Sequence, residues 1–448
     1  MTTKNSISVI GLGKLGVPLA ACLAAKGFRV IGADLDIHKV QPINAGKSPV
    51  FEPGLAELIE KGKDRLSATN DITAAVLASE VTFIVVSTPS EAHGGFSLRY
   101  VLPACETIGG ALSVKKSFHL VVLTSTVMPG CTGNEIRRAL EAHSGKRCGD
   151  DFGLCYNPEF VALGSAIVDM LSPDFILIGE SDSRSGDRLA KIYRQLCGNN
   201  PHIARMNFVN AELTKLAVNT FVTTKISYAN MLAHVCENLP HADVDVVTSA
   251  LGFDSRIGRK YLKGAIGYGG PCFPRDNLAF AQLARQIGAD GTLAEATDLL
   301  NRRQVFRLAE TVLSRLPRGG KVGILGLAYQ PNTNVVDESQ GLELARNLLS
   351  RRVPVVVYDP AAMDNARLAL SDGAVFVASA SECARQSDVV VITTAWDEFR
   401  ALSPVDFNRS NGRPTIVDCW RILPRDRFDW SVNYVAPGMG SRTDGLRE

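Results

Sequence analysis

One stretch of the sequence, residues 264–277, could carry nucleophilic chemistry. It places the thiol of Cys272 among four glycines and two prolines, and Arg275 and Asp276 follow shortly after. Glycines let a backbone approach a ligand closely and prolines stiffen a loop, so this composition favours an ordered loop over a helix or strand. A cation such as Arg275 can stabilise a thiolate and raise its reactivity. The stretch therefore predicts a reactive cysteine, with a structural cysteine in a tight turn as the alternative.

Length and composition favour a large soluble enzyme of two or three domains. The chain has 448 residues, 46% of them hydrophobic, and a net charge of only +2. The absence of a basic run argues against nucleic-acid binding, and no apolar run is long enough to span a membrane. No secretory signal is recognisable at the N-terminus, so a cytoplasmic location is expected. The ten cysteines have no paired spacing, which predicts neither a metal site nor disulfides.

The N-terminal residues have the order that a dinucleotide-binding fingerprint requires. A short apolar strand at residues 6–10 precedes a glycine turn at residues 11–16, and an apolar helical pattern follows at residues 17–25. A second strand, residues 28–33, ends at Asp34, which could bind the ribose hydroxyls and repel the 2′-phosphate of NADP. The alternative for Asp34 is a solvated turn carboxylate. The pattern predicts NAD bound by Gly11, Gly13, Lys14, Leu15, Gly16 and Asp34.

Polar residues follow further predicted strands of this first half. Thr88 and Thr126 come just after the strands at residues 81–87 and 120–124, and Glu159 lies just beyond another strand end. Ligands of doubly wound sheets bind beyond the carboxyl ends of the strands, so these are candidate site residues, although a threonine there is often only a helix cap. With one more strand at residues 175–179, residues 1–205 form a predicted doubly wound domain.

The middle of the chain is predicted to be helical. Residues 211–239 contain no glycine or proline and are apolar at helical spacing, which predicts one long helix. Lys215 and Asn219 would lie on the same face of it, although an exposed lysine beside a polar neighbour has the same spacing. Apart from the cysteine loop, residues 206–316 form a predicted helical domain, and such a long apolar helix often makes a dimer seam.

A second α/β pattern begins after the break at residues 317–320. Its glycines, Gly323 and Gly326, do not complete the dinucleotide fingerprint, so residues 317–448 are expected to form a Rossmann-like domain for another nucleotide-like ligand. The fold class is therefore α/β, with two doubly wound domains joined by a helical domain. The predicted strands of this last part are residues 321–326, 353–358, 388–393 and 415–418.

Taken together, these segments resemble the nucleotide-sugar dehydrogenases of the UDP-glucose and GDP-mannose type over nearly the whole chain. The resemblance implies a three-domain NAD enzyme, at least dimeric, that oxidises a sugar C6 alcohol to a carboxylate in two steps. It rests on residues 11–16 (Gly-Leu-Gly-Lys-Leu-Gly), 125–127 (Ser-Thr-Val), 157–160 (Asn-Pro-Glu-Phe), 212–219 (Glu-Leu-Thr-Lys-Leu-Ala-Val-Asn), 267–276 (Gly-Tyr-Gly-Gly-Pro-Cys-Phe-Pro-Arg-Asp) and 326–329 (Gly-Leu-Ala-Tyr).

The resemblance also implies roles for individual residues. Cys272 matches the nucleophile that forms a thiohemiacetal and then a thioester, and Lys215 and Asn219 match the pair that stabilises the oxyanion. Asp276 matches a carboxylate that handles water and protons, and Glu159 the base of thioester hydrolysis. Thr126, with Thr88, is expected near the cofactor. The implied substrate-binding residues are Glu159, Phe160, Lys215, Asn219, Arg256 (toward the neighbouring subunit), Tyr261, Gly269 and Arg421.

Several positions depart from the family pattern, and one of these departures is at residues 418–421 (Asp-Cys-Trp-Arg), which replace a family Asp-Gly-Arg element. Leu163 and Gln330 replace a usual glutamate and lysine, and Asp337 replaces an arginine that contacts cofactor phosphate. Pro271 stands where relatives that oxidise N-acetylhexosamine nucleotides tend to carry a histidine, which favours UDP-glucose, with GDP-mannose as the rival. A catalytically weakened nucleotide-sugar binder and a β-hydroxyacid dehydrogenase are the alternatives; the latter needs no nucleophilic cysteine and no second Rossmann-like domain.

Overall fold

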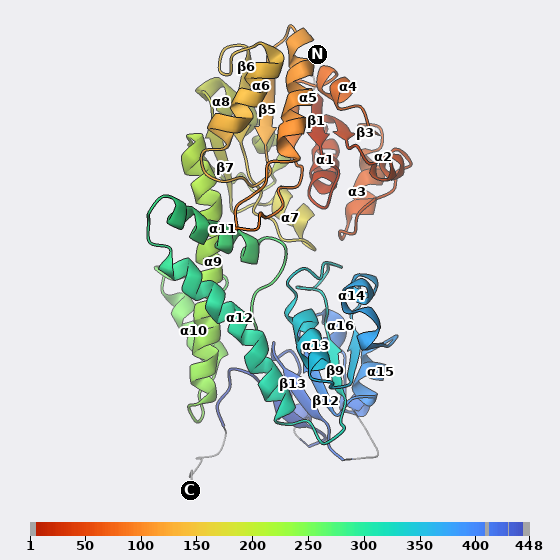
Figure 1. The fold of residues 1–448 in the computed structure, drawn as a ribbon. Coiled ribbons are helices and arrows are strands. Elements are labelled where there is room, and N and C mark those ends of the chain that lie inside the picture. The colour runs from red at the N-terminus through yellow and green to blue at the C-terminus, as the bar shows by residue number, and fades with distance from the viewer. Residues whose placement is uncertain (1–5, 408–411, 429, 442–448) are drawn as a thin grey trace. The chain divides into compact units, whose positions relative to one another are not determined.

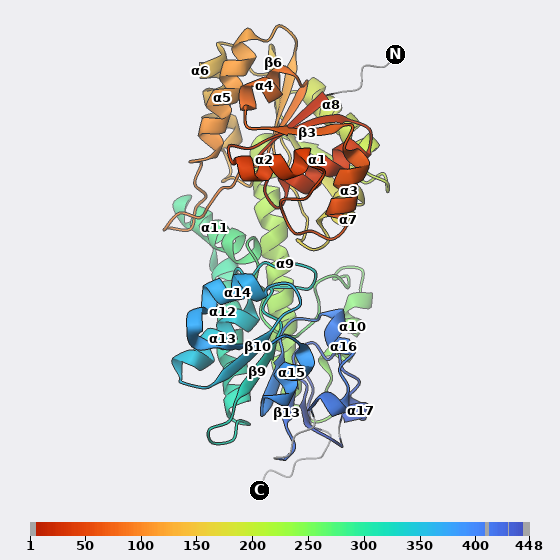
Figure 2. The same cartoon turned by 90° about the vertical axis from the view of Figure 1, so that its right-hand side faces the viewer.

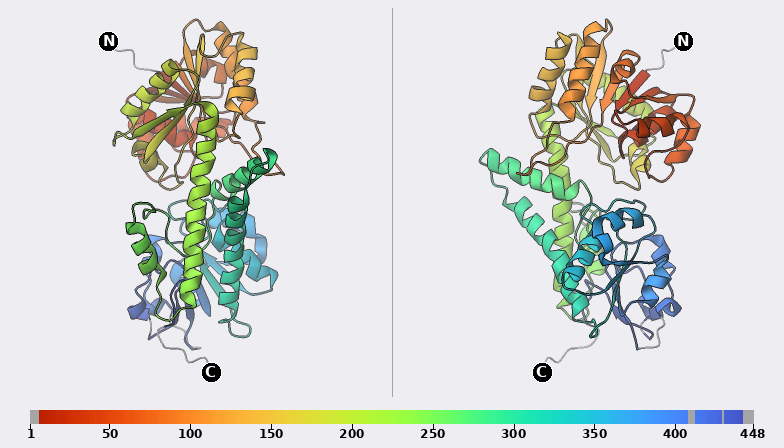
Figure 3. Two further views of the ribbon diagram at one scale, coloured as in Figure 1. Left: turned by 90° about the vertical axis from the view of Figure 1, so that its left-hand side faces the viewer. Right: turned by 45° about the vertical axis from the view of Figure 1, so that its right-hand side comes forward.

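The chain folds into two compact units of the predicted α/β class. The computed structural model describes residues 6–407, 412–428 and 430–441. The chain separates into an N-terminal unit, residues 1–217, and a C-terminal unit, residues 218–448 (Figure 1). The boundary lies inside helix α9 (Phe208–Glu237), which begins in one unit and ends in the other (Figure 3). The finer division at residues 205 and 316 stays a prediction.

The N-terminal unit is built on an eight-stranded sheet in the order β3-β2-β1-β4-β5-β6-β7-β8. Neighbouring strands are parallel except for β6 and β7, which pair antiparallel. The strands are β1 Ser6–Ile10, β2 Arg29–Ala33, β3 Leu66–Thr69, β4 Val81–Ile84, β5 His119–Leu123, β6 Phe152–Tyr156, β7 Phe175–Glu180 and β8 His202–Met206. The helices are α1 Gly16–Ala25, α2 Ile37–Asn44, α3 Leu55–Gly62, α4 Ile72–Leu77, α5 Val101–Val114, η1 Thr132–Ile136, α6 Arg137–Ser144, α7 Ala166–Leu171 and α8 Ser183–Leu196.

Six strands of this sheet were predicted, and two were not. The missed strands, β3 and β8, are the two edge strands, and their side chains are mostly half-buried or exposed. An edge strand packs against few neighbours, so its sequence has neither a long apolar run nor clean alternation. The central strand β1 pairs with β2 and with β4 in parallel register, as a dinucleotide-binding turn at its end requires.

Side chains alternate across the central strands and form one apolar core on each face. Ile7 and Val9 of β1 pack in a cluster with helices α1, α3 and α8, whereas Ile10 belongs to a second cluster with α4, α5 and α6. Because both faces are covered by helices, the strands are apolar on both sides, as is typical of parallel sheets. Helix α1 is almost wholly buried, which explains its continuous apolar sequence.

The C-terminal unit contains the rest of α9, the helices α10 to α17 and an all-parallel six-stranded sheet in the order β11-β10-β9-β12-β13-β14. Helices α12, α13 and α14 pack on one face of this sheet, and α15, α16 and α17 pack on the other (Figure 2). The helices are α10 Val244–Phe253, α11 Phe273–Gln286, α12 Thr292–Leu313, α13 Gln340–Ser350, α14 Met363–Leu370, α15 Ala380–Arg385, α16 Asp397–Arg400 and α17 Arg425–Phe428, with short η2 Ser371–Gly373 and η3 Pro404–Phe407. The strands are β9 Val322–Leu325, β10 Val355–Tyr358, β11 Val375–Phe376, β12 Val389–Ile392, β13 Thr415–Asp418 and β14 Asn433–Val435.

The predicted long helix is confirmed as α9, and the four strands predicted for residues 317–448 are confirmed as β9, β10, β12 and β13, all within a few residues. The short edge strands β11 and β14 were not predicted, again because an edge strand has a weak sequence signal. Within the described residues, no helix is long and apolar enough to cross a membrane.

Candidate active site

The glycine turn between β1 and α1 has the geometry that a dinucleotide needs. A Cβ on Gly16 would lie 1.8 Å from the carbonyl oxygen of Gly11, so strand and helix can approach this closely only with glycine there. A Cβ on Gly13 would meet nothing within 4 Å, so its backbone stays open to an approaching pyrophosphate. Lys14 is exposed and Leu15 is the N-cap residue of α1. The predicted residues of this turn therefore fit NAD, whose chemistry when bound is to accept a hydride.

Asp34 is held beside this turn by hydrogen bonds. Its Oδ2 accepts the backbone N–H of Leu12 at 2.7 Å, and its Oδ1 accepts the N–H of Asp36 at 2.9 Å. The Nζ of Lys39 lies 3.1 Å from Oδ2. The side chain is therefore fixed at the end of β2 and is not the solvated turn carboxylate of the alternative. This is the position from which a carboxylate can bind ribose hydroxyls.

Hydroxyl side chains join the loops after β4 and β5, and one of them, Ser125, donates through Oγ to the carbonyl oxygen of Val86 at 2.6 Å. The Oγ1 of Thr88 donates to the carbonyl oxygen of Thr126 at 2.7 Å. The buried carboxylate of Glu212, in the first turns of α9, accepts the N–H groups of Gly130 at 2.6 Å and Thr132 at 2.7 Å. Thr126 is thus held by the loop after β4, and α9 holds the residues that follow it at 130–132. Glu212 was not predicted as a positioning residue, although it lies in one of the recognised motifs.

Glu159 and Lys215 are brought together in the N-terminal unit. The Nζ of Lys215 donates to the carbonyl oxygen of Glu159 at 2.8 Å and lies 4.7 Å from the ring centroid of Phe160. Lys215 is only 5% exposed, which excludes the exposed helix lysine that its spacing alone allowed. A buried ammonium group retains a fixed charge only where polar partners compensate its desolvation. The buried position and the contacts of Lys215 therefore suit either a functional role or a structural one.

The carboxyl group of Glu159 is poised to exchange a proton near neutral pH. Burial raises the pKa of Glu159 to about 7, although a hydrogen bond from Tyr193 and the charge of Lys215 act in the opposite direction. The Tyr193 hydroxyl lies 3.3 Å from Oε1 of Glu159 and also donates to Oδ1 of the buried Asn157. A carboxyl with this pKa can act as a general base at neutral pH. Tyr193 and Asn157 were not predicted, because they are 36 residues apart in sequence.

In the C-terminal unit, Cys272 stands at the N-cap of helix α11. The positive end of a helix dipole favours the negative charge of a thiolate at this position. Asp276 follows in the first turn and is 0% exposed. Its Oδ2 accepts from Nδ2 of Asn219 at 2.6 Å, and its Oδ1 accepts from Nε and Nη2 of Arg275, each at 3.1 Å. The structure thus assembles Asn219, Arg275 and Asp276 around the base of the cysteine loop.

Cys272 also differs from the other nine cysteines, all of which lie in described ranges. None of the ten forms a disulfide, and only Cys131 and Cys272 are not buried. Burial of its thiol nevertheless raises the pKa of Cys131 to about 12, which keeps it protonated and unreactive. Eight of the ten cysteines are therefore buried, as is usual for cysteines that fill a core.

Two buried asparagines hold the strand-like segment that leads into Cys272. Asn230, on α9, accepts the N–H of Ala265 and donates to the carbonyl of Ile266, both at 2.8 Å. Asn301, on α12, accepts the N–H of Tyr268 at 2.8 Å and donates to its carbonyl at 3.0 Å. Neither was predicted. The sequence signal that could have identified them is an asparagine within an otherwise apolar helical pattern. A buried amide group needs hydrogen-bond partners, so it usually holds a neighbouring segment.

The glycines of the cysteine loop pack against the segment that contains Asp337. Gly270 has a φ of +86°, and a Cβ there would lie 2.6 Å from the ring of Tyr329. Its N–H donates to the carbonyl of Asp337 at 2.9 Å, and a Cβ on Gly269 would lie 2.3 Å from the carbonyl oxygen of Glu338. Asp337, which replaces the arginine of the family pattern, therefore lies in the segment that packs against the cysteine loop, and its side chain is exposed.

The remaining predicted substrate residues have different surroundings. Tyr261 has a positive φ of 64°, and its ring lies 6.2 Å from that of Phe273, next to Cys272. Arg256 is exposed and pairs with Asp254 at 2.6 Å, so it is accessible to a second molecule.

Arg421 is already engaged inside the C-terminal unit. It is bonded to Asp245 through Nε at 2.7 Å and Nη2 at 2.8 Å, and to the carbonyls of Pro437 at 2.7 Å and Gly264 at 2.6 Å. Its side chain is only 7% exposed. These contacts give Arg421 a structural role, and its contact with substrate stays a prediction.

A carboxylate reaches the loop of Leu163 from another part of the chain. Leu163 itself is buried, and Glu52 accepts the N–H groups of Gly164 at 2.8 Å and Ala166 at 2.7 Å. Glu52 thereby caps α7. Among the described residues, no group of acidic, histidine or cysteine side chains could hold a metal ion.

Comparison with known proteins supports this interpretation along the whole chain. The UDP-glucose/GDP-mannose dehydrogenase family's NAD binding domain matches residues 5–197, its central domain residues 209–303 and its UDP binding domain residues 323–425. UDP-glucose 6-dehydrogenase AglM of Haloferax volcanii is 37% identical over 94% of this chain and 97% of its own. GDP-mannose 6-dehydrogenase of Pseudomonas aeruginosa is 36% identical over 79% of this chain and 80% of its own.

A solved structure of a UDP-glucose dehydrogenase, from Pyrobaculum islandicum, superposes with a TM-score of 0.88 at 35% identity, covering 98% of this chain and 99% of that one. Both sheets, the glycine turn and the cysteine loop are therefore features of a known architecture. The chain belongs to the UDP-glucose/GDP-mannose dehydrogenase family, and it is an NAD-dependent nucleotide-sugar dehydrogenase.

Proposed function

We propose that the enzyme oxidises the C6 hydroxyl of UDP-glucose to a carboxylate, with Cys272 as the covalent nucleophile. The alcohol first loses a hydride and a proton to give an aldehyde. The thiolate of Cys272 adds to the aldehyde, and loss of a second hydride converts the thiohemiacetal into a thioester. Water then cleaves the thioester and regenerates the thiol. Each hydride is accepted by one NAD, so one sugar consumes two NAD and one water.

The residues of the chain have separate tasks in this proposal. Lys215 and Asn219, four residues apart on α9, supply donors for the negative charge that develops on the C6 oxygen. Asp276 orients Asn219 through their 2.6 Å hydrogen bond. Glu159, with its pKa near neutrality, takes a proton from the attacking water. Thr126, whose carbonyl oxygen accepts from Thr88, has its proposed place near the reacting carbon and water, as the family resemblance implies.

One observation supports the proposal above the others. Cys272 is a half-buried thiol at the N-cap of α11, and the first turn of this helix contains Asp276, which is fully buried and bonded to Asn219. A structural cysteine would need none of these surroundings, and a binding protein that had lost its activity would have no reason to retain them. A simple hydroxyacid dehydrogenase also lacks a use for them.

UDP-glucose is favoured over GDP-mannose by the relatives that cover most of this chain. Three relatives named UDP-glucose 6-dehydrogenase match over 92–94% of this chain, whereas the GDP-mannose 6-dehydrogenases match over 79%. This wider coverage of the chain supports UDP-glucose as the first candidate. GDP-mannose remains the second candidate because the identities are similar.

Counting NADH per sugar tests the proposal. The purified enzyme is given limiting UDP-glucose, GDP-mannose or a UDP-N-acetylhexosamine, and both NADH and sugar acid are quantified at completion. We expect about two NADH per acid with UDP-glucose. One NADH per sugar would identify a simple alcohol dehydrogenase, and none would identify a binder. Turnover of GDP-mannose alone would replace the substrate but keep the chemistry.

We also propose that α9 forms a homodimer seam in its second half. Phe221, Tyr228, Met231 and Val235 recur at spacings of seven, three and four residues, and their exposures are 65%, 47%, 42% and 49%. Such a continuous apolar stripe is typical of a protein interface. Sedimentation of Phe221→Asp should show dissociation, whereas the matched control Leu368→Asp, on the exposed side of α14, should not. If the wild type, Phe221→Asp and Leu368→Asp all sediment with the same mass, the proposed seam is contradicted.

A further inference from the structure

The fully buried carboxylate of Glu212 has no task in the proposed reaction so far. It lies near the start of α9, and its side chain is 0% exposed. Within the described residues no cationic side chain pairs with it, and its two oxygens accept the backbone N–H groups of Gly130 at 2.6 Å and Thr132 at 2.7 Å. A buried carboxylate is costly unless such partners compensate its charge. The two backbone groups are therefore what allows a glutamate at this position.

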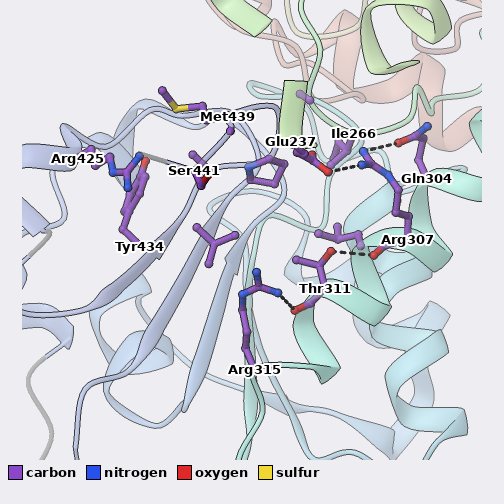
Figure 4. Close-up of a pocket in the computed structure, with 16 residues that line it drawn as sticks. Glu237, Ile266, Gln304, Arg307, Thr311, Arg315, Arg425, Tyr434, Met439 and Ser441 are labelled. Carbon is purple, nitrogen blue, oxygen red and sulfur yellow. Dashed lines mark hydrogen bonds and ion pairs between the residues drawn. The ribbon is translucent and has the colours of Figure 1, made fainter. Parts of the chain in front are cut away.

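The glutamate at the other end of α9 has different surroundings. Glu237, the last residue of α9, pairs with Nη1 of Arg307 at 2.6 Å and accepts the N–H of Gly438 at 2.8 Å (Figure 4). The side chain of Glu237 is 27% exposed, and its charge is compensated by the end of another long side chain, which costs conformational entropy to hold in place. Glu212 binds only short segments of backbone, so it fixes two parts of the fold more rigidly.

The two N–H groups that Glu212 accepts belong to the turn that follows Thr126. Gly130 has a φ of +102°, and its carbonyl oxygen accepts the backbone N–H of Asn134 at 3.1 Å and its Nδ2 at 2.9 Å. The turn is therefore ordered by its own hydrogen bonds. At its beginning, the carbonyl oxygen of Thr126 accepts from Thr88. Glu212 thus joins α9 to a well-held turn, and not to a loose loop.

The same helix reaches the next strand end through Lys215. Strands β5 and β6 are parallel neighbours, and Lys215 lies three residues after Glu212, on the same side of α9. The Nζ of Lys215 donates to the carbonyl oxygen of Glu159, which follows β6, at 2.8 Å. A rotation or a slide of α9 that breaks the contacts of Glu212 must therefore also move this ammonium group relative to Glu159.

Helix capping alone does not explain a glutamate from α9. The N–H groups of residues 130 and 132 lie at the start of η1, where an acceptor is needed. Elsewhere in the described residues, six helices receive this acceptor from the residue directly before them: Asp36, Asp71, Asp182, Asp243, Ser339 and Ser379. The turn after Thr126 instead receives it from 80–82 residues away, on the helix that carries Lys215. The helix after Glu159, α7, is also capped from a distance, by Glu52.

We infer that Glu212 is a positioning residue for the oxidation: it sets α9 so that the ammonium group of Lys215 lies against the loop of Glu159. The inference rests on the proposed role of Lys215. Because the carboxylate is fully buried, Glu212 acts through Lys215 and not by contact with substrate. Glutamine has the same size but only one acceptor oxygen, and its NH₂ group would face one of the two N–H groups. Glu212→Gln therefore weakens the link without creating a cavity.

A double-mutant cycle on kcat tests this link. The rate of acid formation is measured for the wild type, Glu212→Gln, Lys215→Ala and the double variant, with saturating NAD and the nucleotide sugar that gives turnover. We expect Glu212→Gln to lower kcat about tenfold in the wild type but less than about twofold in Lys215→Ala, with the KM for NAD within about twofold throughout. A loss by the same factor in both backgrounds, or a normal kcat in Glu212→Gln, would overturn the inference.

Glu135→Gln is the matched control. Glu135 is an exposed residue of η1 whose charge acts on Glu212, so its replacement makes the same change of charge close by. Its kcat should stay within about twofold of the wild type. An equal loss of kcat in Glu135→Gln and Glu212→Gln would assign the effect to the charge of this region and overturn the inference.

Acetylation of Lys215 tests the position of its ammonium group without catalysis. The proteins receive a short pulse of acetic anhydride, and peptide mass spectrometry compares Lys215, which is 5% exposed, with the exposed Lys191 of the same unit. Relative to Lys191, we expect Lys215 to react at least about threefold faster in Glu212→Gln than in the wild type and Glu135→Gln. An unchanged rate would overturn the inference. Faster labelling together with a near-normal kcat in Lys215→Ala would refute the proposed role of Lys215 but support its positioning by Glu212.

Glu212→Asp replaces Glu212→Gln in both measurements if circular dichroism shows that the glutamine variant is not folded. Aspartate keeps the charge, but its side chain is one methylene shorter and cannot reach both N–H groups while α9 stays in place. The same directions of change are expected in kcat and in labelling. Wild-type values of both quantities in Glu212→Asp would overturn the inference.

Discussion

Replacing Tyr193 by phenylalanine should move the acid limb of the pH–rate profile to higher pH. If Glu159 is the base of thioester hydrolysis, activity requires its ionised form and rises with pH through its pKa of about 7. The Tyr193 hydrogen bond stabilises this ionised form and so lowers the pKa. Without this hydrogen bond, less counteracts the effect of burial on Glu159, so the pKa of Glu159 must rise above its wild-type value.

The size of the change follows from the geometry. A hydrogen bond to a charged group contributes about 1.5–3 kcal/mol. The separation here is 3.3 Å, beyond the usual O–H···O distance, so roughly half of that range is appropriate, about 0.7–1.5 kcal/mol. Since 1.36 kcal/mol corresponds to one pKa unit, the limb should move upward by about 0.5–1 pH unit. Below the limb, the rate should fall about three- to tenfold relative to the wild type.

The assay is the rate of sugar-acid formation between about pH 5.5 and 9, with saturating NAD and substrate. Above the limb, Glu159 is ionised in both proteins, so Tyr193→Phe should approach the wild-type rate there. A rate that is lower by the same factor at every pH would indicate structural damage, and an unmoved limb would refute the link between Tyr193 and Glu159. In Glu159→Gln the limb should disappear, because no group titrates at that position. Tyr100→Phe, at an exposed tyrosine of the same unit, is the control.

Three further predictions concern the other proposed roles. Cys272→Ser should stop acid formation but leave NAD and nucleotide-sugar binding intact, because a hydroxyl is a far poorer nucleophile than a thiolate; sustained acid formation in a turnover assay would remove Cys272 from the mechanism. Asp34→Ala should weaken NAD binding and relax the discrimination against NADP, since it deletes a repulsive carboxylate and releases Lys39, which lies 3.1 Å away, to meet a 2′-phosphate; an unchanged ratio of NAD to NADP affinities would contradict this. Lys215→Ala should lower kcat by roughly 10²-fold or more with a smaller effect on substrate binding. If circular dichroism shows that this variant is folded and its kcat is near normal, Lys215 has only a structural role.

Local sequence determined the elements and the type of chemistry. The glycine turn at residues 11–16 could be interpreted from sequence because each of its glycines answers a short-range requirement, which the close approach of Gly16 to Gly11 shows. The inner strands were predicted for a similar reason: helices cover both faces of the sheet, so the central strands are mainly apolar and are interrupted only by single polar residues such as Ser8 and Thr82. The loop before Cys272 was conspicuous because glycine and proline are frequent in it, but the prediction of a loop as far as residue 277 was wrong: α11 begins at Phe273, because a proline is tolerated in the first turn of a helix.

The tertiary structure decided which distant residues hold those parts in place and how burial and hydrogen bonding affect their ionisable groups. The partners of Glu159 and Cys272 come from distant positions: Tyr193 supports the first, and Asn230 and Asn301 support the segment before the second. The burial of Lys215 could not be known either, since four-residue spacing describes exposed and buried helix faces equally well. Hydrogen bonding and desolvation depend on what surrounds a side chain in space, and a sequence specifies those surroundings only through the complete fold.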